Sequence, residues 1–131
     1  MKRGKLFVLL SAIVLTFTGC RKQTFDERVA AEVEHFNTKE APKRLDSATT
    51  FDSMSYDPSQ LLLSYHYTIE TDIPLEQFPK EDIKQELLRN LRQSIQLKTH
   101  KEHGLLFRYR YVVQPSGEEL IDCTFTPEEY Q

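Results

Sequence analysis

The segment "LLFRYRYVVQ", residues 105–114, has the clearest strand pattern of the chain and determines the expected fold class. Its odd-numbered residues are all aliphatic or aromatic, whereas its even-numbered residues include Arg108 and Arg110. Because successive side chains of a strand point to opposite faces, this alternation predicts a strand with one covered and one solvated face. The turn "PSGE" and the apolar "LIDCTF", residues 120–125, follow and predict a β-hairpin.

The segment "LLLSYHYTIE", residues 61–70, repeats this alternation and predicts another strand of the same kind. It places Tyr65 and Tyr67 on one face and His66 on the other. The preceding segment "SATTFDSMSY", residues 47–56, is rich in threonine, serine and aromatic residues, which suits a strand. The turn-forming sequence "DPSQ" separates the two segments, so a second hairpin is predicted.

Two helices are predicted around these hairpins. Thr24 and Glu27 match the capping-box pattern, so a helix is expected over residues 25–36. An amphipathic helix is expected from about Pro79 to Leu97, between the hairpins. Its apolar stripe consists of Ile83, Leu87, Leu88, Leu91 and Ile95.

Two hairpins with an amphipathic helix between them indicate an α+β domain. We expect a four-stranded, mostly antiparallel sheet that is covered by the helix at 79–97, with the N-terminal helix in addition. The tyrosine and leucine faces of the strands are expected to be the covered ones.

The first 20 residues have the three parts of a bacterial export signal: a basic start, an apolar run and small residues before Cys20. The uncharged run, residues 6–17, is shorter than the roughly 20 residues that span a bilayer. The sequence "LTFTGC", residues 15–20, resembles the lipobox of bacterial lipoproteins, although Phe17 stands where leucine, valine or isoleucine is usual.

This resemblance implies a signal peptide at 1–19, a lipid-anchored tether at 20–24 and a single domain at 25–131. Cys20 would carry acyl chains that hold the protein on a lipid bilayer, because two or more chains anchor stably. The implied location is the non-cytoplasmic side of a cell membrane. Arg21 favours the outer membrane, since enteric lipoproteins retained at the inner membrane have aspartate there. A secretory signal cut elsewhere or an uncleaved helix accounts less well for the Gly-Cys pair.

The charge argues against a nucleic-acid partner, and the cysteine count argues against a disulfide framework. Three of the 17 basic residues and none of the 20 acidic residues precede Cys20, so 14 bases and 20 acids give a charge of −6 from there onward. Nucleic-acid phosphates require a basic surface, so we expect no nucleic-acid partner. With Cys20 acylated, Cys123 has no disulfide partner. It is expected to be a buried small side chain, with a reactive exposed thiol as the alternative.

A longer pattern runs through about residues 33–130. It comprises Asn37, the sequence P-x-x-hydrophobic-D-x-x-T at 42–49, a Y-x-Y pair at 65–67, a helix, and a second Y-x-Y pair at 109–111 before a glycine turn. This pattern resembles a broad set of small exported bacterial proteins of unknown function. The resemblance implies no particular activity.

His66, Arg108 and Arg110 are the candidate binding surface. They are expected on the uncovered face of the sheet, where the planar fork of arginine can hold the carboxylates of a partner or an anionic ligand. The alternative is a solvated face whose arginines form cross-strand salt links with acids such as Glu70 and Asp122.

Other polar clusters predict no catalytic, cofactor or metal site. Asp46 is expected to bond the local backbone beside Thr49, which is a structural role. His100 and His103 do not match the H-E-x-x-H motif, and nothing near them in the sequence supplies the four ligands of a closed zinc site. No nucleophile elbow or phosphate-binding glycine loop occurs, so we do not expect an enzyme.

Together these observations predict a membrane-anchored envelope lipoprotein that acts as a small binding or accessory module, with an envelope protein as its expected partner. The alternative is an inhibitor or immunity-type protein that blocks an enzyme at the cell envelope.

Overall fold

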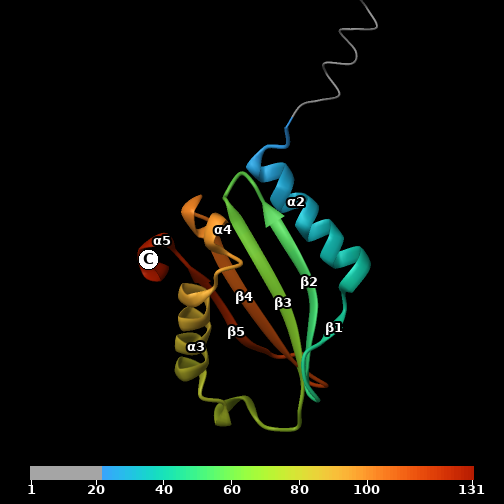
Figure 1. Ribbon diagram of the computed structural model, residues 1–131. Helices are drawn as coiled ribbons and strands as arrows, with labels where there is room; N and C mark the ends of the chain where they lie inside the picture. The colour runs from blue at the N-terminus through green and yellow to red at the C-terminus, as the bar shows by residue number, and fades with distance from the viewer. Residues whose placement is uncertain (1–21) are drawn as a thin grey trace, which may run out of the picture.

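Five strands form one sheet in the order β1-β2-β3-β4-β5, which is also their order along the chain (Figure 1). The computed structural model describes residues 22–131, so Cys20 and the predicted signal peptide lie outside the described residues. The strands are β1 (Lys43–Arg44), β2 (Thr49–Asp57), β3 (Leu62–Glu70), β4 (Leu106–Gln114) and β5 (Glu119–Phe125).

The pairing confirms an α+β fold with two hairpins and corrects the expected strand count. β2 pairs with β3 and β4 pairs with β5 in antiparallel fashion, whereas β3 and β4 are parallel. The sheet has five strands and not four, because Lys43 and Arg44 pair with Phe51 and Thr50. A strand of two residues is too short to show an alternating pattern, which is why the sequence did not predict it.

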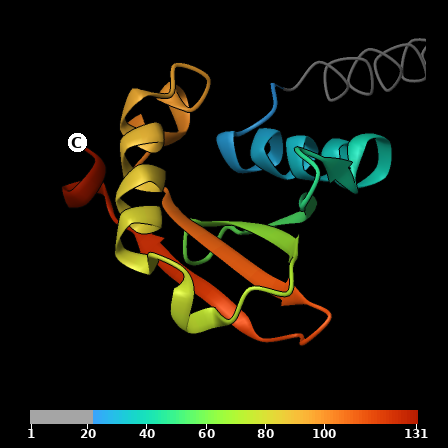
Figure 2. The ribbon, with the colours of Figure 1, turned by 90° about the horizontal axis from the view of Figure 1, so that it is seen from below.

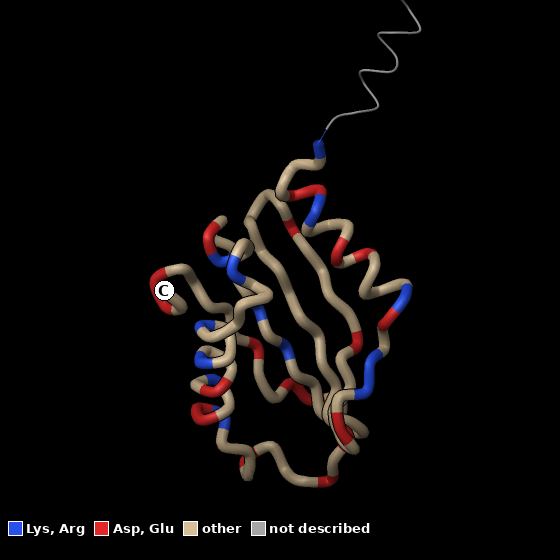
Figure 3. Tube along the Cα trace, viewed as in Figure 1, with Lys and Arg blue, Asp and Glu red and all other residues tan. Residues whose placement is uncertain are grey.

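Helices lie over one face of the sheet, with α2 above the β2 side and α3 above the β5 side (Figure 2). The helices are α2 (Phe25–His35), the π-helical turn η1 (Phe36–Glu40), the 3-10 turn η2 (Leu75–Gln77), α3 (Lys80–Gln93), α4 (Lys98–Glu102) and α5 (Pro127–Tyr130). Charged residues are spread along α2 and α3 (Figure 3). The expected covering by the helix at 79–97 is found in part: α3 packs on β5, and the N-terminal helix α2 packs on β2.

The α2 helix begins where the capping box predicted. The Glu27 backbone N–H donates to Thr24 Oγ1 at 3.1 Å, and the Thr24 backbone N–H donates to Glu27 Oε2 at 3.2 Å. Two side chains of α2, Val29 and Val33, contact the core. Helical spacing predicted this apolar stripe, but spacing alone does not say which strand it covers.

The α3 helix ends four residues before the predicted Leu97. Lys101 Nζ donates to the backbone carbonyls of Leu91 and Arg92 at 2.8 and 3.0 Å, which satisfies two acceptors at the end of the helix. The chain then turns into α4. Ile95, predicted to lie in the apolar stripe, is therefore outside the helix, and 86% of its surface is exposed.

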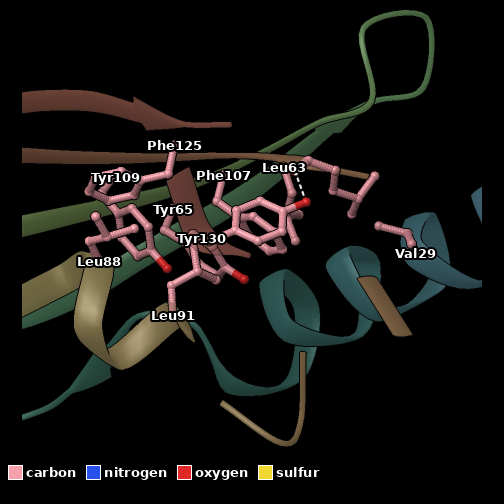
Figure 4. Packing of buried hydrophobic residues seen from close by; sticks show 10 residues of the cluster. Val29, Leu63, Tyr65, Leu88, Leu91, Phe107, Tyr109, Phe125 and Tyr130 are labelled. Atoms are coloured by element: carbon pink, nitrogen blue, oxygen red, sulfur yellow. Dashed lines mark hydrogen bonds between the residues drawn. The ribbon is translucent and has the colours of Figure 1, made fainter. Parts of the chain in front are cut away.

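The core lies between the sheet and the helices (Figure 4). Its fully buried side chains are Val29, Leu63, Leu91, Leu105 and Phe107. The C-terminal Tyr130 also packs into it, and its hydroxyl donates to the Leu105 carbonyl at 2.8 Å. This bond ties the end of the chain to the start of β4.

Two polar side chains shape the edge of the sheet beside β1. Asp46 Oδ1 accepts the backbone N–H groups of Ala48 and Thr49 at 2.8 and 2.7 Å, and these bonds lower the pKa of Asp46. The structural role predicted for Asp46 is thus confirmed. The Asn37 side chain bonds both the N–H and the carbonyl of Met54. It pairs with the open edge of β2 as a neighbouring strand would.

None of the helices in residues 22–131 combines the length and the apolar character that crossing a membrane requires.

Candidate binding site

Four aromatic side chains form a row across the helix-facing side of the sheet. Phe36 of η1, Phe51 of β2, Tyr67 of β3 and Tyr111 of β4 have successive ring-centroid distances of 4.2, 4.6 and 4.4 Å. Phe51 pairs with Tyr67 and Tyr67 with Tyr111 in strand register, so the sheet itself sets the stacking. We call these four residues the aromatic row.

A second set of rings lies one step along the same strands and is more deeply buried. Tyr65 stacks on Tyr109 at 5.1 Å, and Tyr109 contacts Phe125 at 5.8 Å. All three belong to the buried core, whereas Phe51, Tyr67 and Tyr111 of the aromatic row are only half-buried. The helices therefore cover one end of the tyrosine face more completely than the other.

The tyrosine hydroxyls of the aromatic row have no hydrogen-bond partner within residues 22–131. In that part of the chain, His100 Nδ1 is the one fully buried side-chain polar atom that lacks a partner, so the mostly buried hydroxyls of Tyr67 and Tyr111 keep a small solvent-accessible area. Burial of the rings raises the pKa of Tyr111 to about 12 and raises that of Tyr67 further. Both hydroxyls thus stay protonated at neutral pH and can donate as well as accept a hydrogen bond.

A cleft of about 650 Å³ adjoins the aromatic row where α2 faces the connection between α3 and α4. Phe36 and Met54 contribute apolar surface to it, Arg28 and Glu32 come from α2, and Gln96 comes from the connection. The neighbouring residue is Ile95, the most exposed large hydrophobic side chain among the described residues. The site therefore combines an aromatic row, an apolar cleft and an exposed isoleucine nearby.

The opposite face of the sheet holds the three residues that the sequence singled out. His66 and Arg110 are direct partners in the register of β3 and β4, and Arg108 lies two residues along the same face. The structure therefore brings His66, Arg108 and Arg110 together on one face, as expected. We call this side of the sheet the open face.

Both arginines of the open face already hold a carboxylate. Arg108 donates Nε and Nη2 to the two oxygens of Asp122 at 2.7 and 2.6 Å, and Arg110 Nε donates to Glu119 at 3.0 Å. Partial burial, followed by the charges of Arg108 and Arg110, lowers the pKa of His66, so the imidazole favours its neutral form. These two ion pairs are the cross-strand salt links that we gave as the alternative to a binding surface. Binding at His66, Arg108 and Arg110 stays a prediction, and a ligand there would have to compete with Asp122 and Glu119.

The remaining sequence candidates have structural contacts. His100 Nε2 lies 2.8 Å from Glu32 Oε2, and His103 stacks on Phe25 at 3.7 Å, so both histidines hold α2 against α4. No group of three or more potential metal-ligating residues occurs in the part of the chain that the structure describes. Cys123 is half-buried and packs against the core, and burial raises the pKa of its thiol.

The sequence contained only part of the signal for the aromatic row. The two Y-x-Y pairs were visible, and their alternation placed the tyrosines on the helix-facing side. The contributions of Phe36 and Phe51 come from η1 and β2, and no local pattern joins these residues to Tyr67 or Tyr111. The expectation that the tyrosine face is covered holds for Tyr65 and Tyr109 and only in part for the aromatic row.

Residues 24–121 match the model of a protein family described as a domain of unknown function, DUF8479. Among curated protein sequences, none matches the chain.

Solved structures with a similar fold include two pilotins of type II secretion systems. EpsS from Vibrio vulnificus has a TM-score of 0.64 at 12% identity, over 79% of this chain and 89% of EpsS. AspS from Vibrio cholerae has a TM-score of 0.59 at 14% identity, over 78% of this chain and 88% of AspS. The predicted secreted protein PA3611 from Pseudomonas aeruginosa has a TM-score of 0.63 at 8% identity, over 84% of this chain and all of PA3611. At these identities the likeness establishes the fold alone.

Proposed function

The chain belongs to this family of unknown function, and we propose that it is a lipoprotein of the bacterial cell envelope that acts as an accessory module by binding a protein partner. The observation that carries the proposal is the aromatic row, in which Phe51, Tyr67 and Tyr111 stack on one another and stay only half-buried on the helix-facing side of the sheet. In this proposal the protein binds and does not catalyse a reaction.

The physical character of the aromatic row supports recognition of a protein surface. Tyrosine supplies a large apolar area with one polar end, and it is enriched where protein interfaces are well packed. A stacked ring with two side-chain dihedrals loses little further freedom when a partner covers it. The exposed Ile95, which precedes Gln96 of the cleft lining, adds apolar surface. A partner segment with apolar and hydrogen-bonding side chains would therefore fit this site.

The fold supports the envelope setting of the proposal. Two of the similar structures, EpsS and AspS, are pilotins of type II secretion systems, and PA3611 is a predicted secreted protein. By analogy, this chain would serve a larger assembly of the envelope as a small component. Acylation of Cys20 would hold it on the membrane, with the outer membrane favoured by Arg21.

The anchoring is tested by replacing the acylated residue. We expect the wild-type protein to incorporate labelled palmitate and to float with the membrane fraction, and Cys20→Ser to lose both properties. Cys123→Ser is the matched control, because it removes the second cysteine and should leave lipid incorporation unchanged. Equal palmitate incorporation by wild type and Cys20→Ser would contradict the anchoring.

The partner site is tested with a photo-crosslinking amino acid placed at Tyr111 in the native envelope. Arg110 is the matched control position, since it is the neighbouring residue on the same strand and points to the open face. We expect an envelope protein to crosslink from position 111 and not from position 110. Mass spectrometry of the adduct identifies the partner.

Other adducts would redirect the proposal. Crosslinking from position 110 alone would place binding on the open face, around His66, Arg108 and Arg110. A toxin or a hydrolase as the sole adduct would favour the inhibitor or immunity-type function. If no protein crosslinks from either position, the accessory role is contradicted.

A further inference from the structure

The turn between β2 and β3 exposes a leucine in an unusual backbone conformation. Leu61 has a φ of 53°, and it is the one non-glycine residue with positive φ in the described chain. Residues other than glycine, asparagine and aspartate rarely adopt this left-handed region. Leu61 also leaves 37% of its surface exposed. A leucine here occupies a strained backbone position and still exposes part of its apolar surface, which points to a role outside the folded domain.

The turn is held in place by its own hydrogen bonds. Asp57 Oδ1 accepts the backbone N–H and the hydroxyl of Ser59 at 3.0 and 2.6 Å. The Leu61 carbonyl accepts the backbone N–H of Leu106 at 2.8 Å, which ties the turn to the start of β4. Leu61 is therefore presented at a defined place and not on a loose loop.

The start of α2 lies at the same end of the molecule as this turn (Figure 1). Tyr56, near the end of β2, donates its hydroxyl to Asp26 Oδ1 at 2.5 Å, so the first turn of α2 is bonded directly to the strand that leads into the turn. Phe25 stacks on His103 just before β4 begins. We call this end, with the start of α2, the β2–β3 turn and the end of α4, the anchor end.

The tether is short compared with the domain. Five residues, 20–24, precede α2, and a fully extended chain of this length spans at most about 17 Å. β3 and β4 each have nine residues and run in parallel from the anchor end, so the opposite end of the sheet lies about 30 Å away. An acylated Cys20 would therefore keep the anchor end close to the bilayer.

We infer that the anchor end rests on the lipid surface and that Leu61 inserts into the headgroup layer as a second, apolar membrane contact. This inference rests on the proposed acylation of Cys20. The acyl chains supply the attachment, and Leu61 sets the orientation of the domain.

The charge distribution favours this orientation over one in which the domain lies flat. The turn residues Pro58, Ser59, Gln60 and Leu61 carry no charge, whereas charged side chains line α2, α3 and the central strands (Figure 3). Placing either broad side on the membrane would desolvate such charges, including the ion pairs of Arg108 and Arg110. At the anchor end, α2 begins with Asp26, Glu27 and Arg28 and α4 ends with Lys101 and Glu102, so only the uncharged turn can enter the headgroup layer without this penalty. The aromatic row then faces sideways, where a partner in the envelope can reach it.

Tryptophan fluorescence tests the inference, because the chain contains no tryptophan. The acylated Leu61→Trp variant is bound to vesicles of phosphatidylethanolamine and phosphatidylglycerol that carry brominated acyl chains. We expect its emission to shift to shorter wavelength and to be quenched by the bromines. The matched control is Ile73→Trp, which replaces another exposed aliphatic residue at the opposite end of the sheet and should show neither effect.

Two outcomes overturn the inference and are distinguishable. Equal quenching of both variants, or none, in a protein that floats with the vesicles overturns the orientation and leaves the anchoring intact. A protein that does not float overturns the proposed anchoring and the orientation together. Quenching of Leu61→Trp without quenching of Ile73→Trp would exclude an effect of the introduced indole ring, since both variants carry it.

The Leu61→Asn variant separates the membrane role from a folding role. Asparagine adopts positive φ more readily than leucine, so the midpoint of thermal unfolding should be unchanged or higher. Combined with Gln60→Trp as the reporter, Leu61→Asn should reduce bromine quenching relative to Gln60→Trp alone. A lowered unfolding midpoint with unchanged quenching would assign Leu61 a structural role and overturn the inference.

Discussion

The two faces of the sheet differ in how completely the protein satisfies its own side chains. On the open face, Arg108 and Arg110 hold Asp122 and Glu119, so the strongest polar groups already have partners. On the helix-facing side, the rings of Tyr67 and Tyr111 stack at 4.4 Å, while their hydroxyls have no hydrogen-bond partner within residues 22–131. The difference indicates that the open face is adapted to water, whereas the aromatic row can still form hydrogen bonds and apolar contacts with a partner.

The largest expected difference between the faces concerns adjacent leucines of β3. Leu63 is 1% exposed and faces the helices, while Leu62 is its half-buried neighbour on the open face. Leu63→Ala should lower the free energy of unfolding by about 3 kcal/mol, because it leaves a cavity in the core. Leu62→Ala is the matched control and should cost about 1 kcal/mol or less.

Urea denaturation of both variants measures this difference. A Leu62→Ala cost equal to that of Leu63→Ala would mean that the open face is covered in solution, by a partner or a second copy of the chain.

Two tyrosines sharpen the comparison within the helix-facing side. The Tyr130 hydroxyl donates to the Leu105 carbonyl at 2.8 Å, so Tyr130→Phe leaves a buried acceptor unpaired and should cost about 1–2 kcal/mol. The Tyr67 hydroxyl has no partner in the described chain, so Tyr67→Phe should change the free energy of unfolding by about 0.5 kcal/mol or less. Thermal unfolding of the two variants checks the prediction. A large loss in Tyr67→Phe would show that the aromatic row serves stability and would weaken its assignment as a binding site.

The smallest expected effect is the pH dependence of the open face. Arg108 lowers the pKa of Asp122 below its unfolded value, so the pair stabilises the protein above that value and the contribution is lost as the pH falls through the folded pKa. The side chains of Arg108 and Asp122 are 35% and 27% exposed, so screening by solvent limits the effect to about 1 kcal/mol or less.

Acid titration of stability isolates this contribution. Between roughly pH 5 and pH 2, Asp122→Asn should show a flatter loss of stability than the wild type. Identical curves would mean that the ion pair contributes nothing measurable in solution.

The sequence predicted the strands better than it predicted their arrangement. The alternation in residues 61–70 and 105–114 placed β3 and β4 to within one residue, because each strand carries its own pattern. β1 was missed because two residues have no period. α3 ends at Gln93, where Ser94 is extended and Lys101 bonds the carbonyls of Leu91 and Arg92, so Ile95 lies outside the helix.

For the candidate sites too, the sequence predicted some features and missed others. The sharing of one face by His66, Arg108 and Arg110 was predictable, because it depends on alternation along two strands. Their pairing with Asp122 and Glu119 depends on the register between β4 and β5, which alternation does not specify. To predict the aromatic row, one would have to know the contacts between residues that are 15 or more positions apart, such as Phe36 with Phe51 and Phe51 with Tyr67.

Local patterns in the sequence alone determined the α+β class, the two hairpins and the capping box at Thr24, because each depends on residues that are close along the chain. Tertiary structure decided the parallel pairing of β3 with β4, the packing of α2 on β2 and of α3 on β5, and the half-buried state of Tyr67 and Tyr111. The physical reason is that these features arise from packing between distant segments, where apolar burial selects among arrangements that the same local patterns allow.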